Sequence, residues 1–295
     1  MTPRHFKIFI AVCEAQNMTK AAEQLYISQS AVSQAIADLE AHYEAKLFER
    51  FSKRIYLTSA GETLLGYARH IISMMEEAET DIQSLSENGV IRIGASVTVG
   101  TTVVPEIVTS FKKAAPAARI SVVEDNTAAI EALLLKNEID FGLVEGEIVS
   151  PDIVSEPFMK DELVLISGQS HPFSQMPLIA PGELAGQDFI IREQGSGTRR
   201  LFESKMAVGG IAWTASWVCN NSETIKRAVA SGIGVSVISA RSVESERRAG
   251  TLFVSKIQGI EFVRSFKIVR HKNKYITRRM GQFIDHIWNG FSALE

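Results

Sequence analysis

The stretch MTKAAEQLYISQSAVSQAIADLE, residues 18–40, governs the fold of the N-terminal part of this chain. Its first part carries apolar residues at helical spacing, namely Ala21, Ala22 and Leu25. This spacing predicts a short helix from about Thr19, which can serve as its N-cap, to Tyr26. Ile27 and Ser28 interrupt the pattern, and Ser28 or Ser30 can cap a second helix. Two short helices joined by one tight turn are typical of a helix-turn-helix.

The second helix is predicted to have an apolar inner face and a polar outer face. The inner face would comprise Val32, Ala35 or Ile36, Leu39 and Tyr43. The outer face would comprise Gln29, Ser30, Ser33, Gln34 and Ala37. Such side chains can hydrogen-bond to base edges or make methyl contacts when a helix lies in the major groove. An ordinary helical hairpin with a polar surface fits the same pattern, so the motif alone leaves both interpretations open.

A basic segment follows the two helices and favours the DNA-binding interpretation. It combines the cations Lys46, Arg50, Lys53 and Arg54 with strand-like residues, among them Ile55, Tyr56 and Leu57. This pattern indicates a β-hairpin wing whose cations neutralise phosphates, although a charge run can also be a solvated loop. Residues 1–58 are therefore predicted to form a winged helix-turn-helix that binds double-stranded DNA. The candidate DNA-binding residues are Thr19, Gln29, Ser30, Ser33, Gln34, Arg50, Lys53 and Arg54.

The overall composition is that of a globular protein with room for more than one domain. The chain has 295 residues, is 45% hydrophobic and carries a formal net charge of −3. Within residues 1–58, seven Lys and Arg stand against six Asp and Glu, so non-specific DNA affinity should be modest and a dimer would help. No apolar run is long enough for a membrane helix and no signal peptide is recognisable, so we expect a cytoplasmic protein with no membrane partner.

A long helix is predicted over residues 59–89, beginning at a capping box from Ser59 to Glu62 and ending at Asn88-Gly89. Its apolar residues alternate by four and three, which is the spacing of a heptad seam. We expect this seam to make a homodimer or homotetramer, although it could also pack on its own domain. The seam comprises Leu64, Ala68, Ile71, Met75, Ala78, Ile82 and Leu85.

From residue 90 onward, short apolar runs alternate with helical patterns, which predicts an α/β arrangement with parallel-type sheets. The expected strands, largely buried, are 91–95, 120–124, 141–144, 163–167, 189–192, 217–219, 235–239 and 266–269. Two loops between a strand and a helix, 94–100 and 193–198, carry glycines and hydroxyls. Backbone N–H groups at a helix start favour anions, so each loop could hold a carboxylate, sulfate or phosphate. Each loop by itself is a weak signal, because Ser and Thr at helix starts are usually only N-caps, but two such loops in separate half-domains are a stronger one.

The N-terminal residues closely resemble the LysR-type transcriptional regulators. The match is carried by Phe6 and Phe9, Thr19-Lys20-Ala21-Ala22, Leu25, residues 28–34, Ile36, Leu39-Glu40, Leu47-Phe48, Arg50 and Leu57-Thr58-Ser59-Ala60-Gly61. Ser30 stands where many members carry proline, and Gln34 where many carry arginine, so the resemblance leaves the base preferences open. It implies that the equivalent of helix 59–89 forms an antiparallel dimer contact.

The resemblance also implies an effector domain over 90–295 that is similar to periplasmic substrate-binding proteins, with a ligand between two lobes. Lobe I would comprise 90–161 and 266–295, and lobe II would comprise 162–265. On this mapping Ser96 and Thr98 face Ser196, Gly197 and Thr198 across the cleft, and further candidates lie at strand ends. These are Asn126, Thr127, Glu145 and Asn221, of which Asn221 ranks lowest because it can cap a helix. The implied partner is a small, anionic or carboxylate-bearing effector, and Glu145 would favour one that also carries an amine or hydroxyl.

An enzyme on a similar two-lobed scaffold is the alternative. Against it, the histidines show no metal-ligand spacing, and neither a nucleophile elbow nor a Walker loop is recognisable. We therefore expect no catalytic residues, no metal and no cofactor. Cys13 and Cys219 are expected to be reduced core thiols in different domains.

Overall fold

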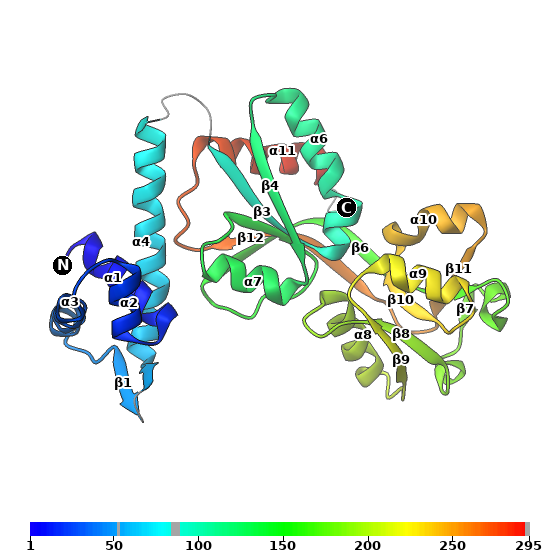
Figure 1. Cartoon of the computed structure of the whole chain (residues 1–295). Coiled ribbons are helices and arrows are strands. Elements are labelled where there is room, and N and C mark those ends of the chain that lie inside the picture. The colour runs from blue at the N-terminus through cyan, green and yellow to red at the C-terminus, as the bar shows by residue number, and fades with distance from the viewer. Residues whose placement is uncertain (52–53, 84–88, 293–295) are drawn as a thin grey trace. The chain divides into compact units, whose positions relative to one another are not determined.

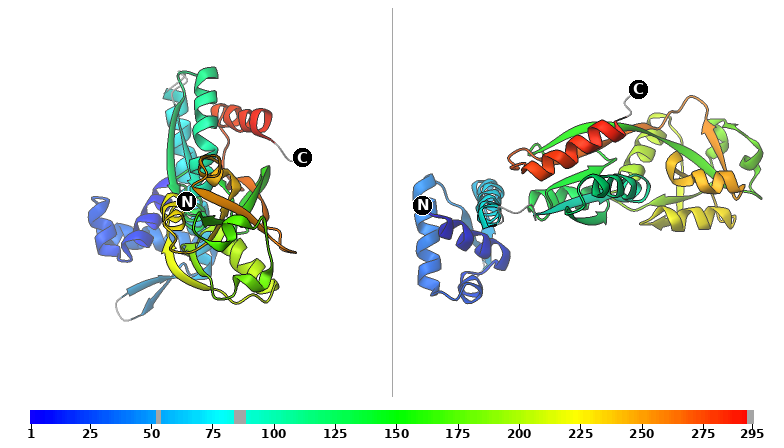
Figure 2. Two further views of the ribbon diagram at one scale, coloured as in Figure 1. Left: turned by 90° about the vertical axis from the view of Figure 1, so that its right-hand side faces the viewer. Right: turned by 90° about the horizontal axis from the view of Figure 1, so that it is seen from above.

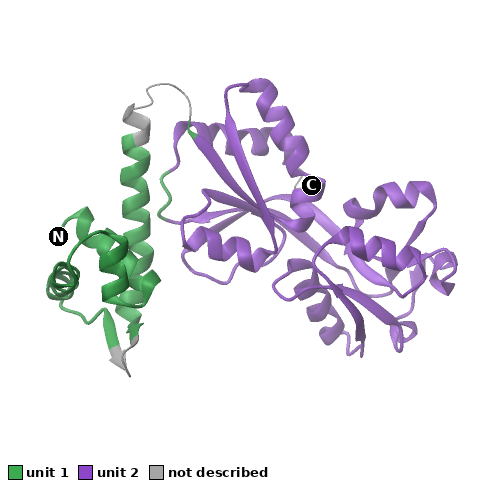
Figure 3. Ribbon diagram, in the orientation of Figure 1, with its two compact units in different colours: residues 1–89, 273–275 green, residues 90–272, 276–295 purple. Residues whose placement is uncertain are grey.

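The computed structural model describes residues 1–51, 54–83 and 89–292. The chain divides into two compact units, shown in different colours in Figure 3. Unit 1 comprises residues 1–89 and 273–275, and unit 2 comprises residues 90–272 and 276–295. Within the described residues, none of the helices combines the length and the apolar character needed to cross a membrane.

The described residues of unit 1 form four helices and one hairpin (Figure 1). Its elements are α1 (Pro3–Ala15), α2 (Met18–Gln24), α3 (Gln29–Tyr43), β1 (Phe48–Phe51), β2 (Arg54–Leu57) and α4 (Ser59–Gln83). Strands β1 and β2 pair antiparallel, which confirms the predicted wing. The core draws apolar side chains from every helix, among them Phe9, Ala21, Leu39 and Leu64. Residues spaced for one helical face thus meet in one core.

The structure corrects two helix starts of unit 1 and confirms a third. Asn17, and not Thr19, is the N-cap of α2, because its Oδ1 accepts from the backbone N–H groups of Thr19 and Lys20 at 2.9 and 3.0 Å. Ser28 caps α3 as expected and accepts from Ala31 N–H at 3.2 Å. Thr58, and not Ser59, caps α4, since its Oγ1 accepts from Gly61 N–H at 3.0 Å.

The inner face of α3 is as predicted except at its end. Val32, Ala35, Ile36 and Leu39 are all buried. The sequence left open whether Ala35 or Ile36 faces the core, and in the structure both do. Tyr43 is 40% exposed and does not belong to the core, because α3 ends at this residue.

Unit 2 alternates strands and helices, as expected for an α/β domain. Its first elements are β3 (Val90–Ser96), α5 (Val97–Thr102), α6 (Val104–Ala114), β4 (Arg119–Asp125), α7 (Thr127–Leu135), β5 (Phe141–Val144) and β6 (Ile153–Gly168). The next are the 3-10 turn η1 (Pro172–Gln175), β7 (Leu178–Ile179), the 3-10 turn η2 (Pro181–Leu184), β8 (Asp188–Arg192), α8 (Gly197–Val208), β9 (Thr214–Cys219) and α9 (Ser222–Ala230). The last are β10 (Ser236–Ser239), α10 (Ala240–Ala249), β11 (Leu252–Ile257), β12 (Val263–His271) and α11 (Arg278–Phe291).

Two long strands connect the halves of unit 2. Strands β6 and β12 pair antiparallel and run from one half into the other (Figures 1 and 2). The main sheet has the order β4-β3-β5-β12-β6-β11-β7, with β10 also paired to β6, while β8 and β9 pair separately. Strands β3, β4 and β5 are parallel, but β5, β6, β10, β11 and β12 also form antiparallel pairs. The sheets are therefore mixed, and the expectation of parallel-type sheets is wrong for this part.

Each half of unit 2 has its own apolar core, so the two halves are lobes. In lobe I, α6 and α11 pack on the sheet through Ile107, Phe111 and Phe283. In lobe II, the packing includes Phe189, Phe202 and Phe262.

The expected strands are present, but 120–124 and 217–219 are not largely buried. They belong to β4 and β9, each of which lies at the edge of its sheet. Val122 and Val218 are accordingly 41% and 50% exposed. Strand β11 and the first half of β6 were not expected from the sequence.

Candidate nucleic-acid interface and effector site

The predicted reading face of α3 is accessible in unit 1. Gln29, Ser30, Gln34 and Ala37 are exposed, and Ser33 is half-buried. Thr19, on α2, is also exposed. Ser30 Oγ lies 2.9 Å from Ser28 Oγ, so it is hydrogen-bonded to the residue that caps the helix. These α3 residues share the side of the helix that is turned away from the apolar core.

Gln34 is held in one orientation by Asp38, one turn further along α3. Gln34 Nε2 donates to Asp38 Oδ1 at 2.8 Å. Asp38 Oδ2 lies 3.4 Å from Nε2 of His5 on α1, which ties the carboxylate to the neighbouring helix. This contact fixes which end of the Gln34 amide faces Asp38 and leaves its oxygen as the acceptor. Asp38 is not among the predicted DNA-binding residues, although the spacing from Gln34 to Asp38 is that of neighbours on a helix face.

The wing is present, but part of it lies outside the described residues. This applies to Lys53 and to the side chains of Arg50 and Arg54, whose backbone forms strands β1 and β2. Lys46 donates to Glu40 at 2.6 Å, and the other oxygen of Glu40 accepts from Leu47 N–H at 3.0 Å. Burial raises the pKa of Glu40, but these hydrogen bonds outweigh it and the pKa is lowered. Lys46 thus anchors the start of the wing to α3.

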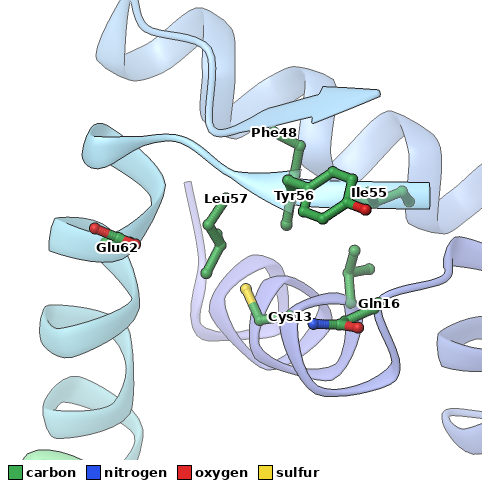
Figure 4. Close-up of a pocket in the computed structure, with 8 residues that line it drawn as sticks. Cys13, Gln16, Phe48, Ile55, Tyr56, Leu57 and Glu62 are labelled. Atoms are coloured by element: carbon green, nitrogen blue, oxygen red, sulfur yellow. The ribbon is translucent and has the colours of Figure 1, made fainter. Parts of the chain in front are cut away.

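A pocket of about 250 Å³ lies between α1 and the wing (Figure 4). Its lining includes Cys13, Gln16, Phe48 and Tyr56. Cys13 is half-buried, and burial raises its pKa to about 12, so the thiol stays protonated at neutral pH. Cys13 and Cys219 are both free thiols, although Cys13 lines a pocket and is not fully in the core.

The predicted dimer seam on α4 has a first part that is buried in its own unit and a second part that is exposed. Leu64 and Ala68 are 6% and 0% exposed and belong to the core of their own unit, with Ile71 partly buried against it. They are therefore unavailable to a second copy, which corrects their assignment as contact residues. Met75 is 40% exposed, and Ala78 is exposed as well. The side chain of Ile82, together with Leu85 and Asn88, lies outside the described residues.

In unit 2 the two lobes touch through one of the two predicted loops, 193–198, which meets Ala128 and Gly146 of the other lobe. Gly195, at a φ of +88°, accepts from the N–H of Ala128 in the other lobe at 3.3 Å. Gly197 packs so closely on Gly146 that a Cβ there would lie 2.4 Å from the Gly146 Cα. A side chain at position 197 would clash with backbone, so glycine is required there for the lobes to meet.

Several other predicted residues have structural roles within their own lobes. Ser96 is buried, and its hydroxyl bridges to the next strand by accepting from Glu145 N–H at 3.2 Å. Thr98 is also buried. Asn126 caps α7 by accepting from Ala129 N–H at 3.0 Å. Asn221 caps α9 by accepting from Thr224 N–H at 2.8 Å, which confirms the alternative role considered for it.

Arg264, which was not among the predicted residues, joins both lobes. It lies on β12 directly opposite Asp161 on β6, and its Nε donates to Asp161 Oδ2 at 2.7 Å. Its Nη1 donates to Thr198 Oγ1 at 2.9 Å. Asp161 also accepts from the Ser239 hydroxyl at 2.6 Å. The side chains of Arg264 and Asp161 are 6% and 0% exposed, so this is a buried, hydrogen-bonded ion pair.

Arg192 forms a second ion pair at the end of β8. Its Nε and Nη2 donate to the two carboxylate oxygens of Glu193 at 2.8 and 2.9 Å. The Arg192 side chain is 2% exposed. An arginine at the end of a buried strand, directly before a glycine loop, is a signal that the sequence carries, although the strand pattern by itself predicts no such role for it.

Several buried polar atoms at the junction have no hydrogen-bond partner among the described residues. They come from both lobes and are Thr127 Oγ1, Glu145 Oε2, Arg192 Nη1, Ser196 Oγ and Arg264 Nη2. Thr127 and Ser196 stand at the N-termini of α7 and α8, where helix dipoles favour negative charge. Buried polar groups are normally paired, so this cluster indicates a place for a polar ligand. No group of metal-ligating side chains occurs among the residues described.

Comparisons with known proteins agree with this architecture. Residues 3–62 match the model of the bacterial regulatory helix-turn-helix protein, lysR family, and residues 85–292 match the LysR substrate binding domain. The chain is 31% identical over 286 residues to the uncharacterized HTH-type transcriptional regulator YeiE of Escherichia coli K12, covering 97% of each chain.

Two solved structures show the same fold. A full-length OxyR variant from Pseudomonas aeruginosa superposes with a TM-score of 0.69 at 21% identity, covering 97% of this chain and 94% of that one. The regulatory domain of Synechocystis PCC6803 CcmR in complex with 2-PG superposes with a TM-score of 0.66 at 24% identity, covering 70% of this chain and 99% of that one.

Proposed function

Since the chain belongs to the LysR family of transcriptional regulators, we propose that it reads operator DNA with α3 and responds to a small anionic effector held where its two lobes meet. DNA binding would be carried out in the cytoplasm by residues 1–58. Candidate contacts are Thr19, Gln29, Ser30, Ser33 and Gln34, with Arg50, Lys53 and Arg54 of the wing reaching phosphates.

One observation carries the effector site: buried polar atoms from both lobes converge without partners. An anion there would accept from Arg192 Nη1, Arg264 Nη2, Ser196 Oγ and Thr127 Oγ1. Both arginines already pair with a carboxylate, so hydrogen bonds from these donors, more than net charge, would hold a small anion. CcmR, a protein of similar fold, binds the small molecule 2-PG in its regulatory domain.

Effector binding would change operator affinity by favouring one arrangement of the lobes. Ala128–Gly195 and Arg264–Thr198 are hydrogen bonds at the junction, so a ligand inserted among them must alter how the lobes meet. A ligand shifts such an equilibrium only by its differential affinity for the two states.

Self-association is the third part of the proposal. The exposed second half of α4, with Met75 and Ala78, would pair with a second copy, so that two reading heads engage two half-sites. With few cations in residues 1–58, this pairing would supply much of the affinity.

The test uses the full chain and a panel of sulfate, phosphate and succinate. Thermal unfolding should shift upward with at least one anion in wild type, because a ligand of the folded state stabilises it. The shift should vanish in Arg192→Gln and persist in Arg200→Gln, whose exposed side chain lies on the helix that follows the same loop. Loss of the shift in both variants, or in neither, would contradict the site.

A further inference from the structure

Glu145 is a buried carboxyl group whose side chain lacks a hydrogen bond to one of its oxygens. It follows β5 in lobe I and is 3% exposed. Its Oε2 has no partner among the described residues. The nearest cation, Nη1 of Arg264, lies 4.0 Å from Oε1, which is longer than a hydrogen bond. An ionised carboxylate is costly to bury under these conditions.

The neighbouring cations compensate the charge of Glu145 only in part, because each is hydrogen-bonded to another carboxylate. Arg264 donates to Asp161 at 2.7 Å, and Arg192 donates to Glu193 at 2.8 and 2.9 Å. An ionised Glu145 would therefore be an additional negative charge beside two completed ion pairs. Protonation of Glu145 removes that additional charge.

Charged groups face Glu145 from four strands: Arg264 on β12, Arg192 on β8, Asp161 on β6 and Glu124 on β4. Burial raises the pKa of Glu145, Arg264 and Arg192 lower it, and Asp161 raises it, with a net upward shift. Burial also raises the pKa of Glu124, Arg192 opposes this, and Glu145 adds to it. The electrostatic environment thus agrees with the geometry.

We propose that Glu145 acts as a neutral carboxylic acid that donates a hydrogen bond to the bound effector, so that effector binding and protonation of Glu145 are coupled. This inference rests on the proposed anion site. The other unpartnered groups at the junction, from Arg192, Arg264, Ser196 and Thr127, can all donate. When Glu145 is protonated, all of these unpartnered groups can donate hydrogen bonds. Such a set of donors fits an oxyanion, which has only acceptor atoms and no amine.

The coupling gives the regulator a second input. When Glu145 ionises, it withdraws its proton donor and places a negative charge against the anion, so binding weakens as the pH rises. The same anion concentration would then produce a stronger response at acidic than at alkaline internal pH.

The first test measures sulfate binding to the full chain by titration calorimetry from pH 5 to 9 at constant ionic strength. Sulfate is the probe because its own charge does not change in this range. At pH values above the pKa of Glu145, the wild-type dissociation constant for sulfate should rise by up to about tenfold per pH unit. This is the slope expected for one linked proton. Glu145→Gln, an uncharged donor of the same shape, should bind with the low-pH affinity at every pH, whereas Glu145→Ala should bind more weakly throughout.

A flat wild-type profile, or equal losses in the Gln and Ala variants, would overturn the coupling. The two proposals fail in different ways. If sulfate binding requires Arg192 but does not change with pH, the anion site is supported and only the role proposed for Glu145 is wrong. If sulfate, phosphate and succinate all leave the full chain unaffected at every pH, the anion site and this inference fall together.

The second test reports the protonation state of Glu145 without any ligand. Infrared difference spectroscopy of wild type against Glu145→Gln from pH 5 to 9 should show the C=O stretching band of a neutral carboxylic acid in wild type only, and this band should persist above the pH at which an exposed glutamate ionises. A carboxylate band in its place would show that Glu145 is ionised and would overturn the inference.

Discussion

Arg264 and Asp161 lie opposite each other on the paired strands β12 and β6, joined by a 2.7 Å hydrogen bond from the arginine Nε to the aspartate Oδ2. Because the strands run through both lobes, this ion pair sits at the point where the lobes join. The same guanidinium reaches Thr198 at the start of α8. One side chain thus connects the strands of the junction to a loop at which the effector is proposed to bind.

Replacing Arg264 by Ala should destabilise unit 2 by about 3–5 kcal/mol, because Asp161 would keep a buried charge without its cation. Calorimetric unfolding of the full chain measures this loss. The exposed pair formed by Lys256 and Glu162, the neighbour of Asp161, provides the matched control. Lys256→Ala should cost less than about 1 kcal/mol. Similar losses in both variants would contradict a special role for the buried pair.

Replacing Gln34 by Ala should weaken operator binding by about 1–3 kcal/mol, because a base-edge hydrogen bond is lost. Binding to non-specific DNA should hardly change, since Gln34 would contribute little to phosphate contacts there. Fluorescence anisotropy with an operator selected from a random library, against a scrambled duplex, measures both affinities. An equal loss on both duplexes would argue against the assignment.

Asp38 provides a sharper test of how Gln34 is oriented. Asp38→Ala and Asp38→Asn both remove a negative charge near DNA, but only Asn keeps the Oδ1 acceptor for Gln34 Nε2. We expect the ratio of specific to non-specific affinity to fall in the Ala variant and to be retained in the Asn variant. If both variants behave alike, charge and not orientation determines the effect of Asp38.

Replacing Met75 by Glu should convert the oligomer to monomers in sedimentation velocity, because a charge would be placed in the exposed part of the α4 seam. Circular dichroism should show an unchanged fold, since Met75 is 40% exposed. Glu79→Lys, on the same helix and also exposed, serves as a charge-change control. A persistent dimer in the Met75 variant would show that α4 is not the main contact.

Glu145→Gln should change how stability depends on pH. The pKa of Glu145 is raised in the folded chain, so its contribution is fully present below the ordinary glutamate pKa and is lost as pH rises through the folded value. Wild type should therefore become less stable than the variant on the alkaline side, and the difference should disappear toward acidic pH. Thermal unfolding at several pH values measures the difference, and parallel curves would rule out a raised pKa.

Local patterns were sufficient for much of unit 1. The apolar spacing of Ala21, Val32 and Leu39 predicted helices and their buried faces, because helical periodicity places such residues on one side. Caps were less predictable. Thr19 and Asn17 are both good capping residues, as are Ser59 and Thr58, and the choice depends on where neighbouring helices fix the chain.

Such local patterns do not predict contacts between residues that are far apart in the sequence. Arg264 is 103 residues from Asp161 and 66 from Thr198, so nothing local marked it as part of a site. The burial of Leu64 and Ala68 in their own unit was equally hidden, because a heptad seam looks the same whether it faces α1 or a second copy.

Local sequence was enough to specify the classes of structure: a winged helix-turn-helix, a long amphipathic helix and an α/β domain with glycine loops at strand ends. These follow from periodicity, capping and turn chemistry, which act over a few residues. The pairing of charges and the donors left over at the lobe junction became visible only once the chain was folded. Burial and compensation of charge depend on side chains that the fold brings together from distant strands, and Glu145 acquires its proposed role only in that setting.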